Sequence, residues 1–215
     1  MGRQGDEGVK AMAAPKANPV APERAAGGQA LLLIDMISCW DFPDAGKLLP
    51  GAIAIAPAIA AFKQRCTRAG VPTIYANDNL GRWRSDFKAL VDISLQCGGN
   101  AAAITTALRP QVDDYFVLKP KHSAFHATPL TILLEHLAVQ TLFVVGVSSD
   151  QCVMTSVAEA RMRDLDVIVP RDLVASQSRQ RNDVALLQFE ETHGLNITPS
   201  PRVRFKRGAR KPAGV

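Results

Sequence analysis

The chain has 215 residues, of which 47% are hydrophobic and 21% are charged. This composition is typical of a globular protein with one large core, and it excludes a chain that is disordered throughout. The longest apolar runs, such as 142–147, are far shorter than the roughly 20 residues of a membrane-spanning helix, so we expect no membrane partner.

The net charge of +5 comes from the two ends of the chain. Residues 1–28 hold four basic and three acidic side chains, and residues 202–215 hold six basic side chains and no acidic one. Residues 29–201 therefore carry a net charge of −2. A mildly acidic body argues against a nucleic-acid-binding face, so we expect no nucleic-acid partner.

Composition also divides the chain into three parts. Residues 1–28 are rich in Ala, Gly and Pro and have no periodicity, so we expect a disordered leader or an arm that wraps a partner subunit. Residues 29–201 are expected to form one domain. Residues 202–215 are expected to form a basic tail that is either solvated or bound to a polyanion.

Short apolar runs alternate with helical patterns between these ends. Strands are predicted at 30–36, 72–76, 115–118, 141–147, 166–169 and 195–198, and helices at 51–69, 129–138, 150–163 and 179–193. Strands that are apolar throughout, each followed by a helix, indicate an α/β fold. We expect a doubly wound, mainly parallel sheet with helices on both faces.

The four cysteines stand far apart, at Cys39, Cys66, Cys97 and Cys152. The sequence has no C-x-x-C pair and no Cys/His cluster at zinc spacing. Residues 11–14 are too short and too weakly apolar for the core of a signal peptide. We therefore expect a cytoplasmic protein whose thiols are all free.

Three reactive side chains follow three of the predicted strands, where ligands of such folds bind. Asp35 ends the first strand, Lys119 follows the third, and Cys152 begins the helix after the fourth. A helix N-terminus stabilises a thiolate, and its N–H groups are suited to an oxyanion. Asp35 is suited to accept the thiol proton.

Each of these residues also has a purely structural interpretation. Cys152 fits a buried structural thiol, Asp35 fits a capping or salt-bridging carboxylate, and Lys119 fits a solvated loop lysine. Nothing in the local pattern distinguishes Lys119 from Lys121. The occurrence of all three residue types at strand ends is what favours a catalytic site.

Three segments carry a family resemblance: 31–36 (LLLIDM), 119–125 (KPKHSAF) and 146–153 (GVSSDQCV). In this order and spacing they resemble the signature segments of the isochorismatase-like cysteine hydrolases. The resemblance covers essentially all of residues 29–200. It implies a Rossmann-type three-layer fold and a homo-oligomer, either a dimer or a tetramer.

The resemblance also implies a catalytic triad of Asp35, Lys119 and Cys152. The family's lysine stands in a K-x-x-aromatic-S-A-F pattern, which selects Lys119 over Lys121. In the implied mechanism Asp35 accepts the thiol proton, and Lys119 favours the charged carboxylate and thiolate. The sulfur attacks the carbonyl of a C–N bond, Asp35 returns the proton to the leaving nitrogen, and water activated by Asp35 hydrolyses the thioester.

A cis peptide bond is a further implied feature, because the family places one just before the turn of the nucleophile. In this chain it would lie between Val147 and Ser148. We expect it to direct the N–H groups of Ser148 and Cys152 toward one oxyanion.

The nicotinamidases of this family hold a metal with an Asp-x-His pair and a further His after the second strand. Here the corresponding residues are Asp78 and Leu80, and no histidine precedes His122. A two-histidine, one-carboxylate site cannot be assembled from this stretch, so we expect no metal and no cofactor.

Residues near the strand ends are candidates for binding a small-molecule substrate. They are Trp40, Asn77, Arg82, Trp83, His122 and Phe125. Asn77 and Arg82 would suit a polar or anionic substrate, with Trp83 as an apolar wall. A surface loop with internal ion pairs is the alternative for 77–88, and core packing is the alternative for Trp40.

The presence of Cys152 helps to distinguish between two reactions of this family. Family members that act on isochorismate cleave a vinyl ether, often without the cysteine. Cys152 therefore favours metal-independent hydrolysis of an amide-type C–N bond through a thioester. Vinyl-ether hydrolysis is the second hypothesis, and a catalytically idle member acting in assembly is the third.

Overall fold

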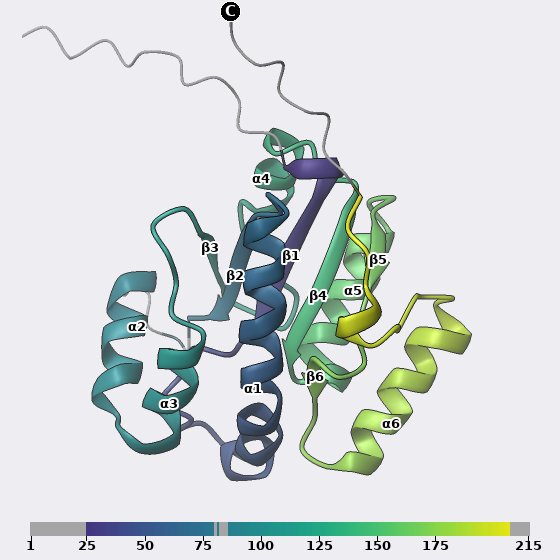
Figure 1. Ribbon diagram of the computed structural model, residues 1–215. Coiled ribbons are helices and arrows are strands. Elements are labelled where there is room, and N and C mark those ends of the chain that lie inside the picture. The colour runs from purple at the N-terminus through teal and green to yellow at the C-terminus, as the bar shows by residue number, and fades with distance from the viewer. Residues whose placement is uncertain (1–24, 80, 82–85, 207–215) are drawn as a thin grey trace, which may run out of the picture.

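The computed structural model describes residues 25–79, 81 and 86–206, and within them a parallel sheet forms the centre of the molecule (Figure 1). Its strands are β1 (Gln29–Ile34), β2 (Thr73–Asp78), β3 (Tyr115–Lys119), β4 (Thr141–Val147), β5 (Asp166–Ile168) and β6 (Val174–Ala175). The strand order is β3-β2-β1-β4-β5, and β6 pairs with the end of β4. Every pairing is parallel.

Helices connect these strands. They are α1 (Ala45–Arg68), α2 (Phe87–Gln96), α3 (Gly99–Ala107), α4 (Leu130–His136), α5 (Met154–Arg161) and α6 (Arg179–Leu187). Short turns of 3₁₀ helix lie at Ala26–Gly28 and Ser200–Arg202, and turns of π helix lie at Ser149–Val153 and Gln188–Thr192.

Both faces of the sheet are covered. All six residues of β1 are buried, and their side chains alternate between two cores. Leu31 and Leu33 pack on the face covered by α1, whereas Leu32 and Ile34 pack on the face covered by α4 and α5. Figure 1 shows α1 in front of the sheet and α5 behind it. The predicted doubly wound α/β fold is therefore confirmed.

Several boundaries differ from the prediction. α1 begins at Ala45 rather than at 51, because the helix includes Pro50 instead of beginning after it. The helices α2 and α3 were not predicted; the Asp86 side chain caps α2 by accepting a hydrogen bond from the Ala89 N–H at 2.7 Å. The predicted strand 195–198 was wrong, since only one isolated bridge, between Ile168 and Asn196, forms there.

By length and composition, α1 is the one helix among the described residues that could cross a membrane. Its place in the fold gives another reason for its apolar character. It covers the sheet with a row of buried residues that includes Leu48, Ile55, Ile59 and Phe62. This is the pattern of a core helix.

The described part of the basic tail, residues 202–206, packs against the domain through Val203 and Phe205, while its basic side chains are exposed. The Arg65 guanidinium on α1 donates to the carbonyls of Ser200 and Val203, and the Phe205 ring lies 5.7 Å from that of Phe62. The Lys206 N–H donates to the Gln29 side chain at the start of β1. Residues 1–24 of the predicted leader and 207–215 of the tail lie outside the described residues.

The expectation that every thiol is free was wrong. Cys39 and Cys97 form a disulfide, with Cα atoms 5.7 Å apart, while Cys66 and Cys152 are free. The fold brings the segment after β1 against the end of α2, so residues 58 positions apart in sequence meet. Free thiols were the premise for a cytoplasmic location, which stays a prediction without that support.

Candidate active site

A pocket of about 240 Å³ lies at the carboxyl ends of the strands. The strand order reverses between β1 and β4, and ligands of open α/β sheets bind at such a switch point. The pocket is lined by Asp35, Ile37, Ser38, Phe42, Leu48, Asn77, Asp78, His122, Val147, Ser148, Gln151 and Cys152.

The three side chains of the predicted triad meet beside this pocket. Lys119 is the last residue of β3, and its side chain is fully buried. Its Nζ atom lies 2.8 Å from Oδ2 of Asp35 and 3.6 Å from Sγ of Cys152. A second carboxylate, Asp78 at the end of β2, lies 3.5 Å from the same nitrogen.

Lys119 is held as an ammonium ion. Burial by itself lowers the pKa of a lysine, because the charged form loses its water. The negative charge of Asp35 and the hydrogen bond to it, with a smaller contribution from Asp78, outweigh burial and raise the pKa of Lys119 above its ordinary value. Lys119 is therefore a fixed positive charge at the inner end of the site.

Asp35 is held by contacts at both carboxylate oxygens. It directly follows β1 and adopts a left-handed backbone conformation with φ of 53°, which Asp tolerates better than most residues. Its Oδ1 atom accepts a hydrogen bond from the Asp78 N–H at 2.8 Å, and its Oδ2 atom faces Lys119. These contacts fix the carboxylate beside the thiol.

Cys152 lies in the π turn that precedes α5, and its thiol is neutral. Burial raises the pKa of Cys152 to about 12, the Asp35 charge and hydrogen bond add to this, and Lys119 opposes it. The sequence predicted a thiolate stabilised by the helix N-terminus. That prediction was wrong for the free protein, because burial and Asp35 outweigh the positive groups.

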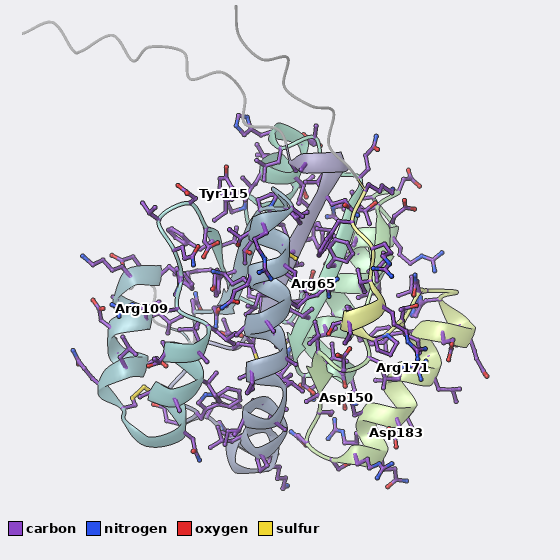
Figure 2. All side chains as sticks on the ribbon, viewed as in Figure 1. Arg65, Arg109, Tyr115, Asp150, Arg171 and Asp183 are labelled. Carbon is purple, nitrogen blue, oxygen red and sulfur yellow. A yellow bond between two sulfur atoms is a disulfide. The ribbon has the colours of Figure 1, made fainter. Side chains whose placement is uncertain are left out.

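The peptide bond between Val147 and Ser148 is cis, at the position that the family resemblance implies. The turn that follows is fixed by Asp150. The Ser148 and Ser176 hydroxyls donate to the Asp150 carboxylate, which also pairs with the Arg181 guanidinium at 2.5 Å. Asp150 is labelled in Figure 2. These bonds tie the turn of the nucleophile to the segment after β6 and to α6.

Sequence reasoning missed Asp150, although an acid in the first turn of a helix signals favourable capping. Burial opposes its charge, but hydrogen bonds from Ser148, Ser176 and Arg181 lower the pKa of Asp150 below its ordinary value. Ile37, Ser38, Leu48 and Gln151 were also missed as pocket residues, and no local pattern marks them.

Two of the predicted substrate-binding residues line the pocket. The buried Asn77 donates from Nδ2 to the Ile37 carbonyl at 2.8 Å, and its Oδ1 atom has no hydrogen-bond partner among the residues that the structure describes. His122 is exposed at the pocket, with Nδ1 3.6 Å from Sγ of Cys152.

Trp40 and Phe125 do not line the pocket. Trp40 is buried in the core on the α1 side, where its ring lies 5.9 Å from that of Phe42, which does line the pocket. Phe125 is buried in the core on the other face, beneath the Arg163 guanidinium. Both rings therefore belong to the two cores of the domain and not to the pocket lining.

The segment after β2 is described only in part, and the predicted binding residues Arg82 and Trp83 lie outside the described residues. Among the residues that are described, no group of three or more His, Cys, Asp or Glu side chains is placed to hold a metal ion.

The sequence of this chain is similar to those of known proteins. Residues 29–199 match the family model described as isochorismatase domain. The uncharacterized isochorismatase family protein YaaI of Bacillus subtilis (strain 168) is 34% identical over 176 residues, which cover 81% of this chain and 96% of that protein. Maleamate amidohydrolase of Pseudomonas putida is 27% identical over 177 residues, covering 79% of this chain and 82% of that protein.

A solved structure has the same fold. The crystal structure of an isochorismatase family protein from Desulfovibrio vulgaris superposes with a TM-score of 0.66 at 23% identity, covering 81% of this chain and 95% of that chain.

Proposed function

The chain belongs to the isochorismatase family of hydrolases, and we propose that it is a metal-independent cysteine hydrolase that cleaves the C–N bond of a small amide-type substrate. The observation that carries the proposal is the contact of one buried ammonium, on Lys119, with both the Asp35 carboxylate and the Cys152 thiol at a pocket. A carboxylate base beside a thiol is the arrangement that nucleophilic catalysis needs.

The first half of the reaction transfers the acyl group to sulfur. Because the Cys152 thiol is neutral, Asp35 accepts its proton as the sulfur attacks the substrate carbonyl. The Lys119 ammonium stabilises the negative charge that moves onto the sulfur and the substrate. Asp35 then gives the proton to the leaving nitrogen, the C–N bond breaks, and a thioester on Cys152 is left.

Backbone groups at the turn are suited to hold the tetrahedral oxyanion. Ser148 and Cys152 both line the pocket, and we assign the oxyanion to their N–H groups. Val147 contributes the other half of the cis peptide that sets this backbone. Water then cleaves the thioester to give a carboxylic acid and the free thiol.

Substrate recognition is assigned to the pocket walls. Asn77 and His122 supply polar contacts, whereas Trp40 and Phe125 act only as packing behind the walls. Arg82 and Trp83 stay predictions from the sequence. The proposal includes no metal and no cofactor. A homo-oligomer is part of it by family resemblance alone, and a cytoplasmic location stays a prediction from the sequence.

The substrate class is supported by the similarity to maleamate amidohydrolase, whose name describes hydrolysis of an amide. The test is ammonia release from a panel of small primary carboxamides that includes maleamate, with the wild-type protein and with Cys152→Ala. Release by the wild type and its loss in Cys152→Ala supports the proposal. Hydrolysis of isochorismate that persists in Cys152→Ala would instead establish the vinyl-ether reaction, and a protein inert toward both would be the idle member.

A further inference from the structure

A fourth side chain contacts the nucleophile. Nδ1 of His122 lies 3.6 Å from Sγ of Cys152, and the ring is exposed at the wall of the same pocket. Lys119 and Asp35 reach the sulfur from buried or partly buried positions at the ends of β3 and β1. His122 is therefore the group at the nucleophile that is best placed to exchange protons with solvent.

The position of His122 is fixed relative to Cys152 by a buried hydroxyl. The Ala124 N–H donates to Oγ of Ser156 at 2.9 Å, and the Ser156 hydroxyl donates to the Cys152 carbonyl at 2.7 Å. Ser156 thus joins the segment that carries His122 to the turn that carries the nucleophile. The backbone that carries His122 is therefore held next to the turn of the nucleophile.

Hydrolysis of the thioester needs a base that can reach a water molecule. Asp35 is partly buried and is held by the Asp78 N–H and by Lys119, whereas the His122 ring is exposed to solvent at the pocket. A neutral imidazole 3.6 Å from the sulfur lies within reach of a water that attacks the acyl carbon bonded to that sulfur. The geometry thus favours His122 over Asp35 for this half of the reaction.

We propose that His122 is a catalytic residue that activates the water which hydrolyses the thioester, an inference that rests on the proposed cysteine hydrolase. Nδ1 of His122 takes a proton from water as the oxygen bonds to the acyl carbon. The tetrahedral intermediate collapses, the C–S bond breaks, and the carboxylic acid leaves. The Nδ1–H of the imidazolium then returns the proton to the Cys152 thiolate, which regenerates the neutral thiol.

The charged groups around His122 belong to the site already described. Asp35, Asp78 and Cys152 line the same pocket, Lys119 lies beneath them, and Lys121 is the exposed neighbour in sequence.

The test separates formation of the acyl-enzyme from its decay. The full chain is treated with p-nitrophenyl acetate, whose nitrophenolate leaves without protonation, and acetyl-Cys152 is followed by intact-protein and peptide mass spectrometry after the reagent is removed. Variants are His122→Ala, His122→Gln and, as the matched control, His126→Ala, an exposed histidine of the same segment. Wild-type decay is compared with each variant, with and without 100 mM imidazole.

We expect acetyl-Cys152 to form in every variant and to decay at least tenfold more slowly in both His122 variants, with His126→Ala unchanged. Imidazole should restore decay in His122→Ala, where it can occupy the vacated space, and not in His122→Gln. A purely structural role for His122 would not give this rescue. Unchanged decay, or slow decay that imidazole does not restore in His122→Ala, overturns the proposal for His122. A wild type that forms no acetyl-Cys152 overturns the cysteine hydrolase itself, and with it the role of His122.

Discussion

The Nζ atom of Lys119 lies 2.8 Å from Oδ2 of Asp35, although the two residues end strands that are not neighbours in the sheet. The strand between them, β2, ends in Asp78, which pairs in register with Lys119. One buried ammonium thus contacts two carboxylates from adjacent strand ends and lies beside the thiol. The site depends on this charge both for its stability and for its chemistry.

Removal of the Lys119 charge should therefore destabilise the fold. In Lys119→Met the apolar side chain fills much of the space, but Asp35 and Asp78 lose their counter-ion. We expect the free energy of unfolding to fall by about 3 kcal/mol. This value is at the low end for a broken buried ion pair, because both carboxylates keep some contact with water. Urea denaturation checks this, with the exposed Lys121→Met as a control that should change by less than about 0.5 kcal/mol. Equal losses in the two variants would contradict the assignment.

Asp150 should contribute stability that depends on pH. The pKa of Asp150 is lower in the folded protein than in the unfolded chain, so its contribution is complete above the unfolded value and is lost as the pH falls through the folded value. We expect Asp150→Asn to lose about 1 kcal/mol at pH 7, since the bonds to Arg181 and the two serines lose their charge assistance. In urea denaturation at several pH values, the gap between wild type and variant should narrow below about pH 4. A gap that stays constant down to pH 3 would show that the charge is not involved.

Gly146 should not tolerate a side chain. It lies near the end of β4 with φ of 111°, and a Cβ atom there would overlap the carbonyl oxygen of Ile34 on β1. We expect Gly146→Ala to cost at least about 3 kcal/mol or to prevent folding, because it forces apart the two strands that border the pocket. Gly46→Ala, with open space around an exposed helical glycine, is the matched control and should raise stability by about 0.5–1 kcal/mol. Similar melting temperatures for Gly146→Ala and wild type would refute this packing.

The disulfide between Cys39 and Cys97 should be measurable by thiol counting. Under denaturing conditions without reductant, two thiols should react with Ellman's reagent, namely those of Cys66 and Cys152, and four should react after reduction. Because the bond closes a long loop in the unfolded chain, we expect the Cys39→Ser and Cys97→Ser double variant to be less stable by about 2–4 kcal/mol. Four reactive thiols before reduction would contradict the bond.

Strand ends were sufficient to locate Asp35 and Cys152, because strands of a parallel sheet bring their carboxyl ends to one edge, whereas Lys119 was separated from Lys121 only by the family resemblance. It could not show the Cys39–Cys97 bond, since that contact depends on the path of the segment after β1 and on the unpredicted helix α2. The ionisation of the Cys152 thiol could not be predicted either, because it depends on burial. A helix N-terminus predicts a stabilised thiolate, whereas the ionisation of a thiol also depends on the low polarity of its surroundings and on nearby carboxylates.

Aromatic residues near the strand ends show the same limit. Trp40 and Phe125 lie close in sequence to Asp35 and Lys119, and proximity suggested a role in substrate binding. Neither ring lines the pocket. Trp40, with a backbone φ of 58°, lies in one core, and Phe125 lies in the other. Leu48, on α1, reaches the pocket from 13 positions beyond Asp35, which no short pattern reveals.

The coupling of Asp35 and Lys119 to the Cys152 thiol is tested most directly by the rate at which iodoacetamide alkylates Cys152 at pH 8, followed by peptide mass spectrometry. Since the pKa of Cys152 is raised to about 12, the wild-type rate should keep rising about tenfold per pH unit from pH 7 to 10. Asp35→Asn should react faster, because the carboxylate that favours the neutral thiol is gone, and Lys119→Met should react more slowly. Equal rates in all three proteins, or a wild-type rate that levels off near pH 7, would contradict the proposed base and nucleophile.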